Sequence, residues 1–251
     1  MLALVGPTGV GKTEAAIAVA RRIPAEIVVV DSMQVYRGMD VGTGKPPEWM
    51  RRQVHHHGLD LADPEEEFDV ARYVGLVRPR LKEIRGRRKL PLLVGGSGLY
   101  LRALMDGICE APGQDLGLRE RLMERERSDG AGTLHSQLKR VDSECAARIH
   151  PNDLRRVVRA LEVYSLTGEP MSGWQRDTTQ SFLKGQEIRV VGLFFQRDLL
   201  YQRIEARVDG WLEGGWLEES RRLAQRRLSR TASKALGYQE LFAYLRGEHR
   251  W

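Results

Sequence analysis

Short, continuous apolar runs alternate with segments of helical periodicity through most of this 251-residue sequence. The runs that have the length and composition of buried parallel strands are Leu2–Val5, Ile27–Val30, Leu90–Val94 and Arg189–Phe195. The segments in which apolar residues recur at helical spacing are Thr13–Arg22, Asp69–Ile84, Gly98–Met105, Leu199–Leu212, Trp216–Arg227 and Gly237–Arg246. This alternation predicts an α/β fold with a parallel sheet.

The stretch 111–185 departs from the alternation. It contains no convincing strand, and glycines and prolines interrupt its helical segments, of which Leu154–Leu166 is the clearest. We therefore expect an all-helical insertion domain at 111–185, set within an α/β core made of 1–110 and 186–251.

A glycine-rich motif joins the first predicted strand to the first predicted helix. Its residues are Gly6, Pro7, Thr8, Gly9, Val10, Gly11, Lys12 and Thr13, which match G-x-x-x-x-G-K-[ST]. In this context the glycines let backbone N–H groups surround phosphate oxygens, and the helix N-terminus adds a positive dipole end. Lys12 supplies a point charge, and the Thr13 hydroxyl is placed to bind Mg²⁺. The motif predicts a P-loop NTPase-like core that binds a di- or triphosphate.

The acid that an ATPase or GTPase needs is missing from the expected strand. Such enzymes carry a Mg²⁺-binding Asp at the end of a second apolar strand, whereas Leu90–Val94 runs into glycines. The acid here is Asp31, which follows Ile27–Val30. Because strand ends of a doubly wound sheet open into the ligand crevice, Asp31 should face the glycine loop. From the pattern, Asp31 is either a general base for an acceptor nucleophile or the cap of the next turn.

Two further motifs are weaker signals. Gly38–Pro47 is a second glycine-rich loop with a cation, Lys45, and loops of this composition are common. The run His55–His57 lacks the spacing of helix-face or finger-like zinc ligands, so packing in the core or in a loop is the favoured interpretation.

Composition narrows the class of protein. The formal net charge is +6, and 33 of the 40 basic residues are Arg, which permits a polyanionic partner but also fits a solvated surface. Two cysteines, Cys109 and Cys145, are too few for a disulfide framework or a four-cysteine zinc site and fit a cytoplasmic protein. No apolar run approaches the roughly 20 residues that a membrane span needs. The absence of an extended coiled-coil pattern favours a monomer.

Taken together and in order, the motifs resemble the tRNA dimethylallyltransferase family, also called tRNA isopentenyltransferases. The segments that carry the resemblance are Gly6–Thr13, Asp31–Tyr36, Gly38–Pro46, Gly95–Tyr100, His150–Glu162 and Lys234–Gln239. They span the whole chain. The glycine loop alone is shared with many enzymes, whereas the ordered set is highly specific.

The resemblance implies transfer of a dimethylallyl group from dimethylallyl diphosphate to the exocyclic amine of the adenosine on the 3′ side of the tRNA anticodon. It implies that Gly6–Thr13 binds the diphosphate of an isoprenoid rather than ATP, with Thr13 near Mg²⁺. Asp31 would then be the general base. Arg207 is the candidate for a further diphosphate-binding cation, and Arg203, one turn earlier, is its competitor.

The resemblance also implies contacts to the anticodon stem-loop. The implied tRNA-binding residues are Asp31, Ser32, Met33, Gln34, Ser97, Arg119, Arg155, Arg156, Val157, Val158 and Arg159. On the helix Leu154–Leu166, spacing places Arg155, Arg159 and Glu162 opposite the apolar stripe, so a solvated face is the alternative to RNA contact. Extrusion of the adenine costs a few kcal/mol, which arginine contacts to phosphate offset.

Two departures from the family pattern affect the expectations. Ser97 stands where the family usually has Thr, which keeps the hydroxyl. The family usually continues past Trp251 into a basic C-terminal helix that helps to hold tRNA, and the sequence ends before that helix, which we expect to be either disordered or truncated. The departure concerns tRNA affinity more than diphosphate binding.

Two rival functions remain compatible with the residues alone. A small-molecule kinase of the shikimate-kinase type also has a glycine loop and an acid after its second strand. A nucleotide-binding RNA-interaction module without transfer activity would carry the same loop and a similar basic surface.

Overall fold

The computed structural model describes residues 1–109, 111–176 and 187–248. The chain divides into two compact units, one made of Met1–Met105 with Phe182–Trp251 and the other of Asp106–Ser181. The expected boundaries at 110 and at 185/186 fall on residues outside the described part. Within the described residues, no helix has the length and apolar character needed to cross a bilayer.

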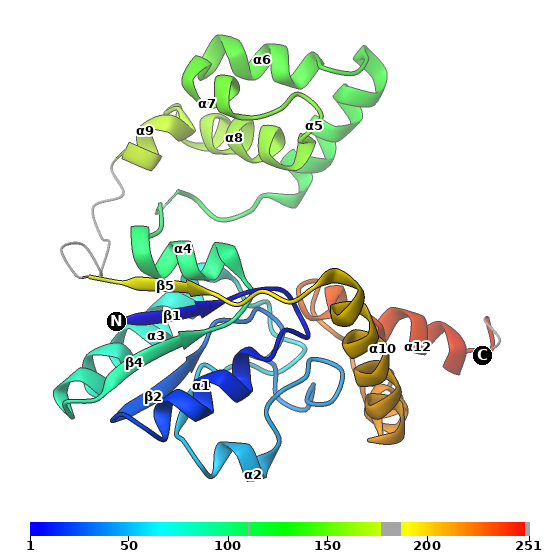
Figure 1. Ribbon diagram of the computed structural model, residues 1–251. Helices are drawn as coiled ribbons and strands as arrows, with labels where there is room; N and C mark the ends of the chain where they lie inside the picture. The colour runs from blue at the N-terminus through cyan, green and yellow to red at the C-terminus, as the bar shows by residue number, and fades with distance from the viewer. Residues whose placement is uncertain (110, 177–186, 249–251) are drawn as a thin grey trace. The chain divides into compact units, whose positions relative to one another are not determined.

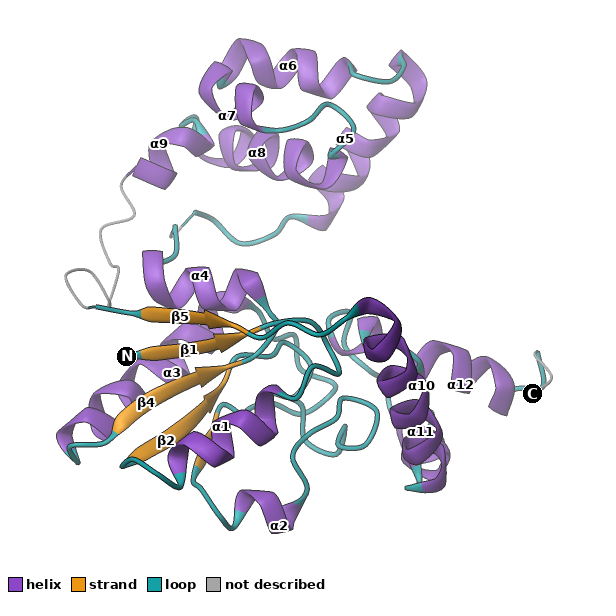
Figure 2. Ribbon diagram, in the orientation of Figure 1, coloured by secondary structure: helices purple, strands orange, loops and turns teal. Residues whose placement is uncertain are grey.

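The first unit is built on a five-stranded parallel sheet, in the order β3-β2-β4-β1-β5 (Figure 2). The strands are β1 Leu2–Val5, β2 Ala25–Val29, β3 His56–His57, β4 Leu90–Val94 and β5 Arg189–Gly192. The α/β prediction is confirmed, and four of these strands lie where the apolar runs predicted them. The two-residue β3, which pairs with Ile27 and Val28 of β2, is too short to leave a pattern in the sequence.

The helices of this unit agree with the predicted segments to within a few residues at most ends. They are α1 Lys12–Ala20, α2 Glu48–Arg51, α3 Val70–Gly86, α4 Gly98–Asp106, α10 Arg197–Glu213, α11 Trp216–Leu223, the 3₁₀ helix Ala232–Lys234 and α12 Tyr238–Leu245. The sequence analysis missed α2 and the 3₁₀ helix, because a single turn shows no periodicity.

Helices α1 and α3 cover opposite faces of the sheet (Figure 1). Ile17 of α1 packs against side chains that share one face of the pleated sheet, among them Ile27 and Val94. On the other face, the buried Tyr73 of α3 donates a hydrogen bond of 2.7 Å to the carbonyl oxygen of Val29. Both faces are therefore closed, so ligands have access to the sheet at its strand ends.

The described residues of the second unit contain five helices and no strand. They are α5 Leu116–Asp129, α6 Thr133–Val141, α7 Ser143–Arg148, α8 Leu154–Thr167 and α9 Met171–Arg176. The core of the unit includes Leu122 of α5, Leu138 of α6 and Leu161 of α8.

One expectation about α8 is wrong. Glu162 does not lie on a solvated face, because its side chain is completely buried. It lies one turn after Val158 and so flanks the apolar stripe, where α5 packs against α8. Its carboxylate is stabilised there by ion pairs with Arg119 and Arg159, at 2.7 and 2.6 Å, and by the backbone N–H of Asp115 at 2.8 Å.

Candidate functional site

The glycine loop connects β1 to α1 in a conformation that only its glycines tolerate easily. Gly6, Gly9 and Gly11 have φ values of +152°, +83° and +94°. A Cβ on Gly6 would also lie 2.7 Å from the carbonyl oxygen of Leu193. Gly11 precedes α1 and no side chain caps the first turn of that helix. Its first N–H groups and its positive dipole end are therefore available to an anion.

Lys12 lies at the start of α1 and folds back over the loop. Its Nζ donates hydrogen bonds to the carbonyl oxygens of Gly6 and Pro7, at 2.9 and 2.8 Å. Burial lowers the pKa of this amine, Asp31 partly offsets that effect, and Arg207 lowers the pKa further. A bound phosphate would stabilise the protonated form of the amine, because it would place negative charge next to the ammonium group.

Asp31 follows β2 and fills one of the two roles that the sequence left open, the cap of the next turn. Its Oδ1 accepts hydrogen bonds from the backbone N–H groups of Met33 and Gln34, at 2.8 and 3.2 Å, so Asp31 does cap the next turn. Within the described residues, Oδ2 has no hydrogen-bond partner, which leaves one carboxylate oxygen for a ligand. The Ser97 hydroxyl holds the same turn by accepting from the N–H of Ser32 at 3.1 Å.

Helix α10 places two arginines against the loops. The Nε of Arg203 donates to the carbonyl oxygen of Gly9 at 3.1 Å. Arg207 donates to the carbonyl oxygen of Gly44 at 3.4 Å, and its guanidinium lies 4.5 Å from the centre of the Trp211 ring. Burial lowers the pKa of Arg207, although a guanidinium remains protonated at neutral pH.

These groups line one cavity of about 530 Å³. Its polar lining includes Lys12, Thr13, Asp31, Gln34, Arg203 and Arg207. Ile27, Val29 and Met50 contribute an apolar wall. The cavity therefore brings together the cations of Lys12, Arg203 and Arg207, the carboxylates of Glu14 and Asp31, and room beside them for an apolar group.

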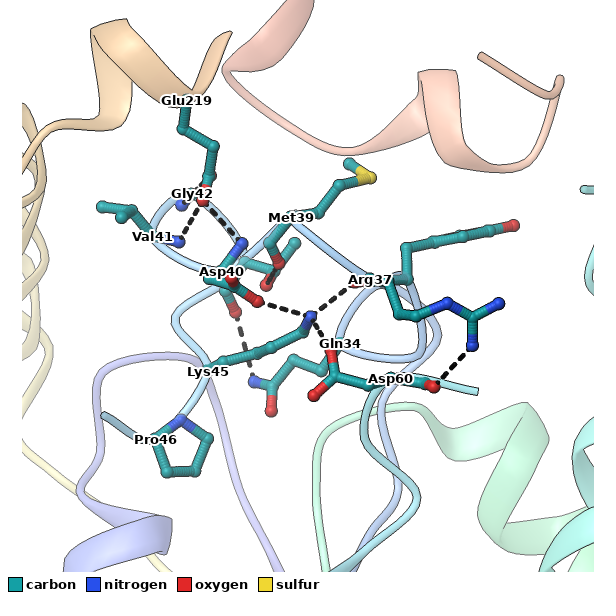
Figure 3. Close-up of polar contacts among 12 residues, drawn as sticks. Gln34, Arg37, Met39, Asp40, Val41, Gly42, Lys45, Pro46, Asp60 and Glu219 are labelled. Atoms are coloured by element: carbon teal, nitrogen blue, oxygen red, sulfur yellow. Dashed lines mark hydrogen bonds and ion pairs between the residues drawn. The ribbon is translucent and has the colours of Figure 1, made fainter. Parts of the chain in front are cut away.

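The lysine of the second glycine-rich loop, Gly38–Pro47, interacts with acidic side chains. Lys45 is fully buried, and its Nζ lies 2.7 Å from Asp40 and 2.6 Å from Asp60 (Figure 3). It also donates to the carbonyl oxygen of Tyr36. Lys45 therefore closes the loop as an internal ion pair and is not free to bind a phosphate.

The histidine run lies at the edge of the sheet. The Nδ1 of His56 is 2.7 Å from the carbonyl oxygen of Val54, and the Nε2 of His57 is 2.7 Å from Glu26. Glu26, His55 and His57 bring three potential metal-ligand atoms within 4.8 Å of one another. However, Glu26 already forms ion pairs with Arg87 and Lys89, which oppose the binding of a cation.

The tRNA-binding candidates fall on both units and differ in what their side chains can offer. Val157 and Val158 are buried in the core of the second unit, so their side chains are not exposed to an RNA. Arg119 and Arg159 share Glu162, and about three-quarters of each arginine side chain is buried. Arg155 is exposed, and among the described residues no hydrogen bond or ion pair engages it. Arg156 is exposed and pairs with Asp153.

The fold and the cavity define the class: a parallel α/β protein whose strand ends carry a cationic pocket suited to a phosphorylated substrate. Family comparison gives the particular group within this class. A model described as IPP transferase matches residues 34–251, and one described as isopentenyl transferase matches residues 1–54.

Curated relatives agree with the family models. The chain is 48% identical to the tRNA dimethylallyltransferase of Symbiobacterium thermophilum, over all of this chain and 79% of the relative. It is also 48% identical to that of Moorella thermoacetica, over 99% of this chain and 78% of the relative. The chain belongs to the tRNA dimethylallyltransferase family, whose enzymes transfer a prenyl group to tRNA.

Solved structures are similar as well. The tRNA isopentenylpyrophosphate transferase of Bacillus halodurans is 40% identical, with a TM-score of 0.67, over 99% of this chain and 78% of that chain. A eukaryotic dimethylallyltransferase captured while acting on tRNA is 27% identical, with a TM-score of 0.77, over 99% of this chain and 63% of that chain.

Proposed function

We propose that this chain transfers a dimethylallyl group from dimethylallyl diphosphate to the exocyclic amine of the adenosine on the 3′ side of the tRNA anticodon. The observation that carries the proposal is the combination in one cavity of a glycine loop for the diphosphate with the carboxylate of Asp31, which lies at a strand end and has one unused oxygen. We further propose that the enzyme acts as a monomer in the cytoplasm.

In the proposed reaction the bond between the allylic carbon and the diphosphate oxygen breaks, and a bond from that carbon to the adenine nitrogen forms. The diphosphate leaves with the bonding electron pair. The N–H groups at the start of α1, Lys12 and Arg207 stabilise the negative charge that develops on it. Oδ2 of Asp31 accepts the proton that the amine loses, while Oδ1 stays fixed by the turn amides. The apolar wall at Ile27 and Val29 would accommodate the dimethylallyl group.

The residues present fit a Mg²⁺ ion that arrives with the diphosphate. Thr13 lines the cavity and its hydroxyl has no hydrogen-bond partner among the described residues, so it can serve as an oxygen ligand. The described residues place no group of three carboxylate, histidine or cysteine ligands in this cavity. Mg²⁺ usually binds through one or two protein groups together with substrate phosphates, and there it would neutralise charge on the leaving group.

The arginines proposed to contact tRNA differ in how exposed their side chains are. Arg155 and Arg156 are the exposed arginines of α8 and are the stronger candidates for phosphate contact. Arg119 and Arg159 hold Glu162, so we propose that they act on tRNA through donors left over from that cluster. Ser32, Met33 and Gln34 form the turn beside Asp31, where the extruded adenine would arrive.

The test uses two variants of Asp31. Asp31→Asn keeps a carbonyl oxygen that can accept from the turn amides but removes the base, whereas Asp31→Ala removes both. With labelled dimethylallyl diphosphate, Mg²⁺ and unmodified tRNA, we expect both variants to lose about 10²–10⁴-fold in transfer. Binding of the diphosphate should be largely retained. Transfer by Asp31→Asn at the wild-type rate would refute the role of Asp31.

The same assay separates the proposal from its rivals. Label that enters AMP in place of tRNA would indicate a relative that acts on free nucleotides. ATP consumption with a small acceptor would indicate a kinase, and tRNA binding without either reaction would indicate a binding module.

A further inference from the structure

A buried carboxylate outside the cavity organises the second glycine loop. Glu219 of α11 is 2% exposed. Its Oε2 accepts hydrogen bonds from the N–H groups of Asp40 and Val41, at 2.7 and 2.9 Å, and its Oε1 accepts from the N–H of Gly42 at 3.2 Å (Figure 3). Three successive backbone amides of the loop thus converge on one side chain.

The fourth donor to Glu219 comes from a neighbouring helix. The hydroxyl of Tyr238, at the start of α12, donates to Oε1 at 2.6 Å. Burial raises the pKa of Tyr238, and the adjacent carboxylate raises it further, so the phenol remains a proton donor at neutral pH. Among the described residues, no Lys or Arg forms an ion pair with Glu219. The loop amides and one phenol therefore provide its stabilisation.

The next residues of the loop touch the groups that line the cavity. The carbonyl oxygen of Gly44 accepts from Nη2 of Arg207 and from Nε2 of Gln34, both at 3.4 Å. The carbonyl oxygen of Thr43 accepts from the same Gln34 amide at 3.1 Å. The position of these two carbonyl groups therefore sets the position of Arg207 and Gln34 in the cavity.

Helix α11 packs closely against this loop, so the position of the helix restricts the position of the loop. A Cβ on Gly42 would lie 1.9 Å from Nε1 of Trp216, the first residue of α11. A Cβ on Gly44 would lie 1.9 Å from Nη2 of Arg207. Such contacts leave the loop little room to shift without moving the arginine.

We propose that Glu219 is a positioning residue for the diphosphate site: it fixes the amides of Asp40–Gly42, and through the Gly44 carbonyl it holds Arg207 in place. The inference rests on the proposed function, in which Arg207 binds the diphosphate. It adds a residue of α11 that lines no part of the cavity.

The test is Glu219→Gln, which replaces one acceptor oxygen by an NH₂ group that faces N–H donors. We expect the KM for dimethylallyl diphosphate and the Kd for inorganic pyrophosphate to rise about tenfold, with a smaller change in kcat and an unchanged Kd for tRNA. The matched control is Glu218→Gln on the same helix, where Glu218 is exposed and, in the part of the chain that the structure describes, pairs only with Arg221. That control should leave all these constants unchanged.

A double-mutant cycle with Arg207→Ala separates positioning from a general loss of structure. If Glu219 acts through Arg207, adding Glu219→Gln to Arg207→Ala should weaken pyrophosphate binding by less than about twofold more. Independent, multiplying effects would overturn the proposal. So would a wild-type pyrophosphate Kd in a folded Glu219→Gln protein.

A milder variant covers the case in which Glu219→Gln does not fold. Tyr238→Phe removes one of the four hydrogen bonds and leaves the loop amides in place, so we expect a pyrophosphate Kd between the wild-type and Glu219→Gln values, or about twofold to fivefold above wild type. An unchanged Kd would count against the proposal. Because pyrophosphate binding needs no prenyl transfer, failure of the proposed function and failure of this inference give different results.

Discussion

The two glycine loops of the first unit contain the same Gly-Lys pair and use the lysine in opposite ways. Among the described residues, Lys12, in the loop Gly6–Thr13, donates hydrogen bonds only to backbone carbonyl oxygens. Lys45, in the loop Gly38–Pro47, lies between the carboxylates of Asp40 and Asp60. One ammonium group lacks a negative partner in direct contact, and the other has two. The difference teaches that the charges around a lysine, rather than its glycine-rich surroundings, decide whether its ammonium group is available to a ligand or is committed to ion pairs within the fold.

Loss of the Lys12 ammonium should have the largest effect. We expect Lys12→Ala to lower kcat/KM for prenyl transfer about 10³-fold, or about 4 kcal/mol, because the developing charge on the diphosphate loses a donor. The free energy of unfolding should change by less than about 1 kcal/mol, because the partly buried ammonium group has no carboxylate partner to leave behind. Steady-state kinetics and urea unfolding of the same preparation measure both quantities. If Lys12→Ala were much less stable but kept the wild-type kcat/KM per folded molecule, Lys12 would contribute to the fold rather than to the ligand site, contrary to this comparison.

Loss of the Lys45 ammonium should act on stability instead. Lys45→Met leaves Asp40 and Asp60 without their shared partner, and we expect about 3 kcal/mol less free energy of unfolding in urea. Lys139→Met, at an exposed position of α6, is the control and should change this free energy by less than about 0.5 kcal/mol. An equally stable Lys45→Met protein would show that the ion pairs make no net contribution.

Glycine replacements within the second loop can separate backbone strain from placement of Arg207. Gly44 and Gly38 have φ values of +63° and +73°, so alanine at either position should cost about 1 kcal/mol of stability. A Cβ on Gly44 meets Arg207, whereas a Cβ on Gly38 has no atom within 4 Å. We expect only Gly44→Ala to weaken pyrophosphate binding, by about tenfold, as measured by calorimetry. Equal affinities in the two variants would argue against the role of this loop.

The smallest effect concerns pH. Because burial lowers the pKa of Lys12 from its usual 10.5, its ammonium loses the proton at lower pH than an exposed lysine does. Pyrophosphate affinity should therefore begin to fall as the pH rises toward 10.5, in a range where an exposed lysine stays charged. In Lys12→Arg the guanidinium stays protonated, so this alkaline decrease should be absent whatever the overall affinity. The same decrease in both proteins would assign it to another group.

The parts of the site that the sequence could predict are local. The loop Gly6–Thr13 depends on glycines and a lysine within eight residues, and Asp31 depends on its place after an apolar run. Both patterns remain visible without knowledge of the fold. Lys45 pairs with Asp40 and Asp60, which are 5 and 15 positions away, through a loop conformation that no sequence pattern predicts. The role of Glu162 could not be predicted, because Arg119 and Asp115, which are 43 and 47 positions away, decide it. The bond between Glu219 and Asp40, for example, joins residues 179 positions apart.

Short elements were missed for a related reason. Strand β3 is only two residues long and exists because β2 offers it a hydrogen-bonding edge. The position of Glu162 was misjudged because a helical wheel treats everything outside the apolar stripe as solvent, whereas α5 covers the flank of that stripe. Tertiary packing overrides local pattern in both cases.

The buried Glu162 has a consequence for how tRNA binding should respond to salt. Each phosphate that a protein neutralises releases condensed counterions, and the steepness of the salt dependence reports how many such contacts are made. Arg119 and Arg159 share one carboxylate, so these three side chains together carry a single net positive charge. A count of arginines on α5 and α8 would therefore overstate the number of ions released on binding, and Arg155 should contribute to the salt dependence more than either of them.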